Sequence, residues 1–100
     1  MRYQQGDVLL KNVEVDLSSA ETLKHLVLAE GEVTGHCHRI TQGQAKLMML
    51  KNIMYLKVIS DYAKLFHDEH GEIDVPNGIY EVGRVREYDH FEEEARQVRD

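Results

Sequence analysis

The chain has 100 residues, one cysteine, one proline and a formal net charge of −6. This length fits a single domain over residues 1–100, and the negative charge argues against a protein that binds nucleic acid by neutralising phosphates. The lone Cys37 excludes an internal disulfide and fits a reducing compartment. No apolar run is long enough to span a bilayer, so we expect a cytoplasmic protein without a membrane partner.

The first half of the chain alternates short β-rich runs with polar breaks. Residues 3–6 are expected to form a turn, and residues 7–15 a strand whose far end alternates apolar and polar side chains. A polar loop is expected at residues 16–20. Residues 23–29 and 33–40 are then expected to be extended, with a glycine-containing break between them.

The middle of the chain is ambiguous between helix and strand. After a hairpin-type turn at residues 41–44, the apolar residues of segment 45–60 are dense enough for a buried helix. However, a polar interruption at residues 51–52 precedes a run of strand-forming residues at 54–59. We therefore favour two strands that turn near residues 51–52, followed by another short strand at residues 63–67.

The clearest strand is predicted near the C-terminus. Residues 79–88 alternate almost perfectly between two faces, with Ile79 on one face and Tyr80 on the other. Two turns are predicted before it, at residues 68–71 and 76–78. In the second turn, proline fixes φ and glycine tolerates a positive φ.

The end of the chain changes character. Asp89 is a good N-cap, and Glu92 follows three residues later, as in a capping box. We predict a short helix over about residues 89–98, within a C-terminal tail of residues 89–100. The remaining residues, 1–88, are predicted to form a mostly β core, a small antiparallel β-barrel or sandwich.

Four of the six histidines lie in two short segments, residues 35–39 and 67–71. On a strand, residues i and i+2 point to the same side, so the two histidines of the first segment face one way and Cys37 the other. Neutral imidazole is a good ligand for transition metals. We predict that the fold brings both segments together as one site for a divalent metal (zinc, nickel, iron or manganese) with these ligands: His36, His38, His67 and His70.

Other interpretations of these residues stay open. The same histidines also fit a polar strand face and a solvated turn. His25 and His90 lack histidine neighbours and are expected to be structural or to lie on the surface. Asp68 and Glu69 fit solvated turn carboxylates better than extra ligands. Cys37 is expected to be a small buried side chain.

Three function hypotheses follow from the sequence. The first is a metal-binding domain, which is an enzyme if an open coordination position activates water or polarises a substrate. The second is a non-catalytic interaction or oligomerisation module that uses residues 47–50 and the acidic tail, and we expect a homo-oligomer. The third is a metal-free enzyme in which paired histidines act as acid and base on a phosphate ester. Nothing in the sequence names a small-molecule substrate.

Two stretches resemble parts of the cupin pattern. One is residues 31–42, with the His-x-His pair and with Gln42 where cupins usually place glutamate; the other is residues 73–81, which is similar to the cupin Pro-x-Gly stretch. The resemblance implies a double-stranded β-barrel that often holds iron, manganese, nickel or zinc. It also implies a ligand set in which the last cupin histidine falls on a glutamate: His36, His38, Gln42 and Glu81.

The chain as a whole also resembles a family of small, uncharacterised bacterial proteins. The shared motifs are Gly-Glu-Val-Thr-Gly-His-x-His-Arg at residues 31–39, His-x-x-His-Gly at 67–71, Pro-x-Gly-x-Tyr-x-Val at 76–82 and Arg-Glu-Tyr-Asp at 86–89. This resemblance covers most of the chain and is more specific than the cupin one. It brings no known activity with it.

Overall fold

The computed structural model describes residues 2–30 and 37–84. The predicted C-terminal helix at residues 89–98 and the end of the strand predicted at 79–88 lie outside these residues. In the described part, every element is a strand and no helix is long and apolar enough to cross a membrane. The strands are β1 (Arg2–Gln5), β2 (Val8–Asn12), β3 (Glu21–Thr22), β4 (Val27–Glu30), β5 (Cys37–Gln42), β6 (Ala45–Leu50), β7 (Ile53–His67) and β8 (Gly71–Arg84).

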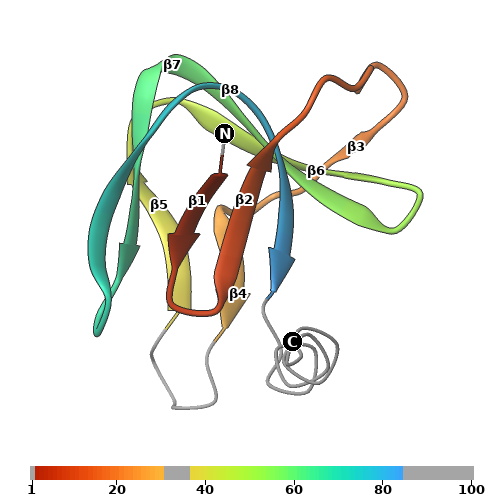
Figure 1. Ribbon diagram of the computed structural model, residues 1–100. Coiled ribbons are helices and arrows are strands. Elements are labelled where there is room, and N and C mark those ends of the chain that lie inside the picture. Colours follow the sequence, from red (N-terminus) through yellow and green to blue (C-terminus); the bar gives the residue numbers. More distant parts are fainter. Residues whose placement is uncertain (1, 31–36, 85–100) are drawn as a thin grey trace, which may run out of the picture.

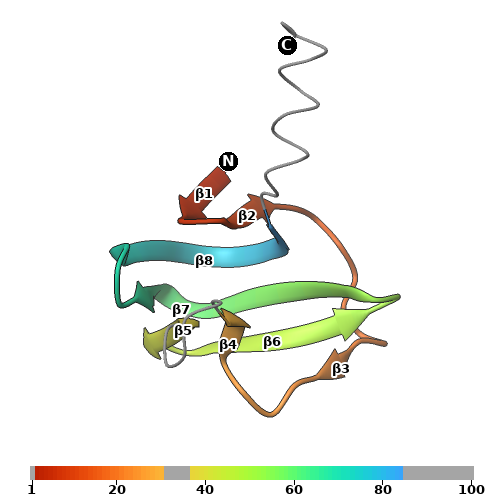
Figure 2. The ribbon, with the colours of Figure 1, turned by 90° about the horizontal axis from the view of Figure 1, so that it is seen from below.

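These strands form one antiparallel sheet that curls into a half-barrel (Figures 1 and 2). The strand order is β1-β2-β8-β7-β5-β4, with β6 paired to β7 and β3 paired to β6. The mostly β prediction is therefore confirmed, whereas the likeness to a cupin stays a prediction. The buried hydrophobic core consists of these side chains: Val8, Leu10, Leu28, Ile40, Leu47, Leu56, Val58, Ala63, Leu65, Val75 and Tyr80.

The ambiguous segment forms two strands, as the sequence favoured. β6 and β7 pair directly, from Ala45 opposite Val58 to Leu50 opposite Ile53. The two residues between them, Lys51 and Asn52, have φ values of 53° and 68°. Positive φ at both central positions is typical of the tight turn that matches the twist of a hairpin.

The turn predicted at residues 76–78 is wrong, because these residues lie inside β8. The partner strand, β7, contains a bulge between Val58 and Tyr62. β7 continues through residues 63–67, so these residues do not form the separate short strand predicted from the sequence. The side-chain amide nitrogen of Asn77 lies 2.9–3.3 Å from three bulge carbonyls. A bulge re-aims a strand without ending it. The proline and glycine of β8 lie opposite this bulge, so they mark a bend in a continuous strand and not a turn.

The turn predicted at residues 3–6 is also wrong. Arg2–Gln5 forms β1, and the turn falls at Gly6 and Asp7, with a φ of 58° at Gly6. The strand predicted over residues 7–15 begins at Val8 and ends at Asn12. Arg-Tyr-Gln-Gln contains one good strand former, so its strand conformation comes from pairing with β2. The position of this hairpin is important for the site described below, because the hairpin carries two polar side chains to the histidines.

Candidate histidine site

The structure brings the rings of His38, His67 and His70 together at one end of the half-barrel. The ring centroid of His38 lies 4.2 Å from that of His67 and 6.2 Å from that of His70, and the last two are 4.6 Å apart. The pairing of β5 with β7 explains this, because Arg39 opposite Phe66 places His38 beside His67 in the antiparallel register. His36, the fourth predicted ligand, lies outside the described residues.

His38 is held by the N-terminal hairpin. Its side chain is buried, and Nδ1 lies 2.8 Å from Oε1 of Gln5. The amide nitrogen of Gln5 donates to the carbonyls of Leu65 and Gly71. The amide oxygen is therefore the group that faces His38, and it accepts a hydrogen from Nδ1. In a neutral His38 ring, Nε2 then carries the lone pair.

Nε2 of His38 faces a carboxylate. It lies 3.3 Å from Oδ1 of Asp7, whose Oδ2 accepts hydrogen bonds from Nη2 and Nε of Arg84 at 2.6 and 3.2 Å. Partial burial acts to raise the pKa of Asp7, but the hydrogen bonds and charge of Arg84 outweigh it and lower that pKa. Burial and the neighbouring His67 lower the pKa of His38, with Asp7 opposing them.

A neutral His38 and an ionised Asp7 would thus place two hydrogen-bond acceptors against each other. A neutral Nε2 lone pair and a carboxylate oxygen repel one another unless a cation lies between them. A proton on Nε2 would convert the contact into an ion pair. A metal ion bound between the two groups would also remove the repulsion, and it would do so without charging the ring, because both groups are ligands for divalent transition metals.

His67 closes the turn between β7 and β8. Its side chain is buried, and Nδ1 accepts hydrogen bonds from the backbone N–H groups of Glu69 and His70 at 3.1 and 3.3 Å. The Nδ1 lone pair is therefore occupied, and in the neutral ring the hydrogen lies on Nε2. In this arrangement His67 stabilises the turn and presents no lone pair to a metal.

His70 lies over the turn of the β1–β2 hairpin. A Cβ atom added to Gly6 would meet Cδ2 and Nε2 of His70 at 2.5 and 2.6 Å. Glycine at this position therefore permits the ring to rest on the backbone, directly before Asp7 in the chain. Because the His70 side chain is exposed, its ring can rotate without disturbing the core.

The described residues contain no group of three or more His, Cys, Asp or Glu side chains arranged to hold a metal ion. The preformed part is the pair of His38 and Asp7. In a tetrahedral site with bonds of about 2.0–2.1 Å, two ligand atoms lie roughly 3.3–3.4 Å apart. The 3.3 Å between Nε2 and Oδ1 matches this separation.

The other residues singled out from the sequence lie elsewhere. Asp68 and Glu69 are exposed in the turn. Cys37, expected to be buried, is half-buried and accepts a hydrogen bond from Arg39. Gln42 and Glu81, the further ligands implied by the cupin resemblance, line two separate hollows. The exposed His25 accepts the backbone N–H of Val27, and His90 lies outside the described residues.

Sequence reasoning missed Gln5, Asp7 and Arg84. The available signal was Gly6-Asp7, a glycine–aspartate pair of the kind found in two-residue hairpin turns. A hairpin there would have placed β1 beside β2. It would not have shown that the turn reaches β5, because that contact depends on how the whole sheet curls.

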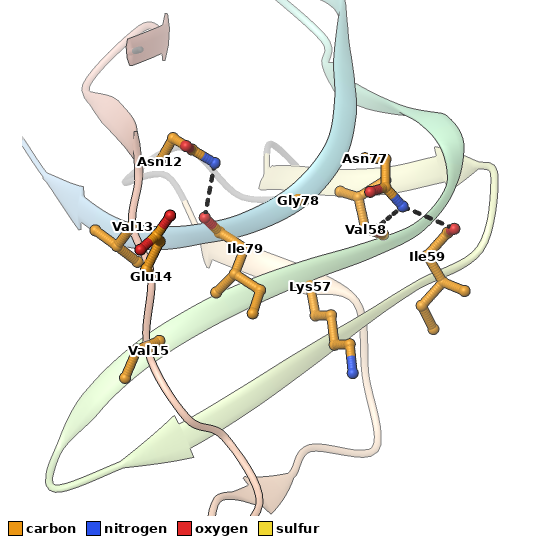
Figure 3. A pocket seen from close by; sticks show the side chains of 10 residues that line it. All are labelled: Asn12, Val13, Glu14, Val15, Lys57, Val58, Ile59, Asn77, Gly78 and Ile79. Carbon is orange, nitrogen blue, oxygen red and sulfur yellow. Dashed lines mark hydrogen bonds between the residues drawn. The ribbon is translucent and has the colours of Figure 1, made fainter.

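A second concave region lies where β7 and β8 bend. It is an open groove of about 550 Å³, and Figure 3 shows side chains from the end of β2, from the residues that follow it and from both long strands around it. The apolar part of the groove lining comes mainly from valine and isoleucine side chains. The lining residues are Asn12, Val13, Glu14, Val15, Lys57, Val58, Ile59, Asn77, Gly78 and Ile79.

Comparison with known proteins gives one match. No curated protein and no solved structure matches the chain. A family described as a domain of unknown function, DUF8820, matches residues 4–85. This range includes both histidine segments and excludes the Arg-Glu-Tyr-Asp motif at residues 86–89. The expectation of an uncharacterised small family is confirmed, and the chain belongs to the DUF8820 family.

Proposed function

We propose that this protein is a small metal-binding domain that holds a divalent transition metal (zinc, nickel, iron or manganese) between His38 and Asp7. One observation carries the proposal: the Nε2 atom of a buried imidazole lies 3.3 Å from a carboxylate oxygen, while its Nδ1 atom faces an amide oxygen. Both groups are acceptors, and their separation suits two ligands of one ion. Gln5 also gives His38 the hydrogen-bonded second nitrogen that is usual for metal-bound histidine.

Further ligands must complete such a site. His70 is the best placed of the described histidines, because its exposed ring lies on Gly6, beside Asp7. His67 contributes by fixing the turn that carries His70. His36 stays a predicted ligand from outside the described residues. Water would fill the remaining positions, and a metal-bound water is a nucleophile near neutral pH.

The competing interpretation is that a proton occupies the same place. His38 would then be an imidazolium ion paired with Asp7, and the histidines would serve as acid and base without a metal. Burial argues against this, since it lowers the pKa of His38. The metal-free enzyme and the interaction module stay predictions, as does the homo-oligomer.

Metal binding can be tested with tag-free protein. We expect Zn²⁺ or Co²⁺ to bind stoichiometrically in calorimetry and to raise the melting temperature. Asp7→Asn and His38→Gln should each lose most of this effect, because each removes one ligand. His25→Gln is the matched control, since His25 is exposed and, within residues 2–30 and 37–84, accepts just one backbone N–H.

Two results would end the proposal. One is the failure of zinc, nickel, iron, manganese and cobalt to bind. The other is unchanged metal affinity in both Asp7→Asn and His38→Gln. Nitrogen-15 spectra of metal-free protein at pH 7 would identify the competing case directly, because an imidazolium His38 has hydrogens on both ring nitrogens.

A further inference from the structure

Gln5 is one of the contacts between the N-terminal hairpin and the rest of the half-barrel, besides the pairing of β2 with β8. Its side chain is 2% exposed and bonds to three partners on three elements: His38 on β5, Leu65 on β7 and Gly71 at the start of β8. Among the described strands, β1 itself pairs with β2 alone. This one amide therefore joins the edge strand β1 to three other strands, in addition to the ring contact of Tyr3 with Tyr80 on β8.

We infer that Gln5 is a positioning residue that makes metal binding at His38 and Asp7 and docking of the β1–β2 hairpin a single event. The inference rests on the proposed metal site. It concerns how that site is regulated: the site is complete only while the hairpin is docked, and a bound metal holds the hairpin in place.

The orientation of the Gln5 amide is fixed by its surroundings. If the amide were reversed, its oxygen would face the carbonyl oxygens of Leu65 and Gly71, and its NH₂ group would face Nδ1 of His38. Two acceptor–acceptor contacts would result, one buried and one partly buried, and this is costly. The observed orientation therefore keeps a hydrogen on Nδ1 and turns the lone pair of Nε2 toward Asp7.

The two proposed ligands come from parts of the chain that this amide joins. Asp7 belongs to the hairpin turn, and His38 belongs to β5. If the hairpin separates from the rest of the sheet, Asp7 moves away from His38, and Nδ1 of His38 loses the Gln5 oxygen to which it donates. Because coupling free energies are reciprocal, whatever a docked hairpin adds to metal affinity, the metal adds to hairpin docking.

Metal-free protein tests the role of Gln5 first. In wild type, nitrogen-15 spectra should show the hydrogen of neutral His38 on Nδ1. Gln5→Met, which keeps the length and removes the amide, should give a mixture of tautomers and faster hydrogen exchange in β1 and β2. Gln4→Met is the matched control, because the exposed side chain of Gln4 donates to the carbonyl of Gly6 in the adjacent turn and lies away from His38; it should leave both readouts unchanged.

Metal-loaded protein tests the coupling. Gln5→Met should weaken Zn²⁺ binding by about 10–100-fold, the usual effect of removing the partner of a ligating histidine. Zn²⁺ should slow amide exchange in β1 and β2 of wild type more than in the β6–β7 hairpin. If Gln5→Met does not fold, this wild-type comparison and the wild-type tautomer still decide the matter.

Each outcome has a definite meaning. The positioning role is overturned if neutral His38 of wild type carries its hydrogen on Nε2. It is also overturned if His38 has the same tautomer in Gln5→Met as in wild type. Equal protection of both hairpins by Zn²⁺ overturns the coupling. If Zn²⁺ does not bind while the metal-free results are as expected, the metal site fails and the positioning role of Gln5 stands.

Discussion

Two regions of the half-barrel use the same device to different ends. At the bend of β7 and β8, the Asn77 amide donates to carbonyls of the β7 bulge, beside an open groove (Figure 3). At the other region, the Gln5 amide donates to Leu65 and Gly71 and also accepts from His38. The first amide serves backbone groups alone, whereas the second also sets the chemistry of an ionisable ring.

The difference in burial decides what each amide is worth. The Gln5 bonds are buried or partly buried, so the groups left behind by its loss could not turn to water. Two of the Asn77 bonds are exposed, and the carbonyls they serve can be hydrated instead. A buried unsatisfied group costs about 1–3 kcal/mol, while an exchange with water costs far less.

The largest expected effect is therefore the loss of the Gln5 amide. Gln5→Met should lower the free energy of unfolding by roughly 2–4 kcal/mol, because it leaves more than one buried group unsatisfied. Asn77→Ala should cost about 1 kcal/mol, because water replaces part of what is lost. Urea denaturation of both variants measures the difference. Equal losses would show that the two amides have the same structural role and would remove the contrast.

The contact between His70 and the hairpin turn can be tested with two glycines. Gly6 and Gly71 both have positive φ, 58° and 78°, so alanine at either site should cost about 1–2 kcal/mol of stability. Only at Gly6 would the new Cβ strike the His70 ring; at Gly71 it meets nothing within 4 Å. We expect Gly6→Ala alone to displace that ring and to weaken Zn²⁺ binding.

Titration calorimetry and His70 NMR signals report this result. If Gly71→Ala weakens zinc binding as much as Gly6→Ala does, the effect is one of backbone strain. The position of His70 on the turn would then be irrelevant to metal binding.

What the sequence could predict follows from which contacts are local. Alternation of apolar residues identified the second half of β8, from Ile79 onward, and the turn at Lys51 and Asn52 separated β6 from β7. The sequence also predicts a turn at residues 68–71, and the structure contains one at residues 68–70. Each of these features depends on neighbours a few residues away, so periodicity and turn chemistry suffice.

The missing features depend on long-range packing. Gln5 and His38 are 33 residues apart, and Asp7 and Arg84 are 77 apart. Their contacts exist because the sheet curls, and that curl depends on the bulge in β7, which the sequence did not indicate. The same bulge explains why Pro76 is compatible with a continuous strand, since a proline is tolerated beside a bulge.

A smaller effect concerns the pH dependence of stability without metal. The folded protein holds the pKa of His38 below its ordinary value of 6.5. As the pH falls below 6.5, the unfolded chain takes up the proton before the folded chain does, so stability should fall. Above 6.5 this contribution is fully present. Denaturation in the presence of EDTA at several pH values should show the loss, and His38→Gln should reduce it.

If stability instead rises as the pH falls through this range, the folded protein prefers the imidazolium. Asp7 would then outweigh burial, and a proton would occupy the place assigned to the metal. The sign of this dependence therefore separates the two cations that could relieve the contact between His38 and Asp7.

The smallest expected effect compares two ion pairs on the surface. Lys64 bonds to Asp74 at 2.9 Å and Arg84 bonds to Asp7 at 2.6 Å, both with partly exposed side chains. Lys64→Met should change the free energy of unfolding very little, because exposed pairs are screened by water. Arg84→Met should cost a similar amount but should also change zinc affinity, since Arg84 orients the carboxylate that faces His38. Equal zinc affinity in both variants would mean that Asp7 faces His38 without help from Arg84, and Arg84 would then have no role in the metal site.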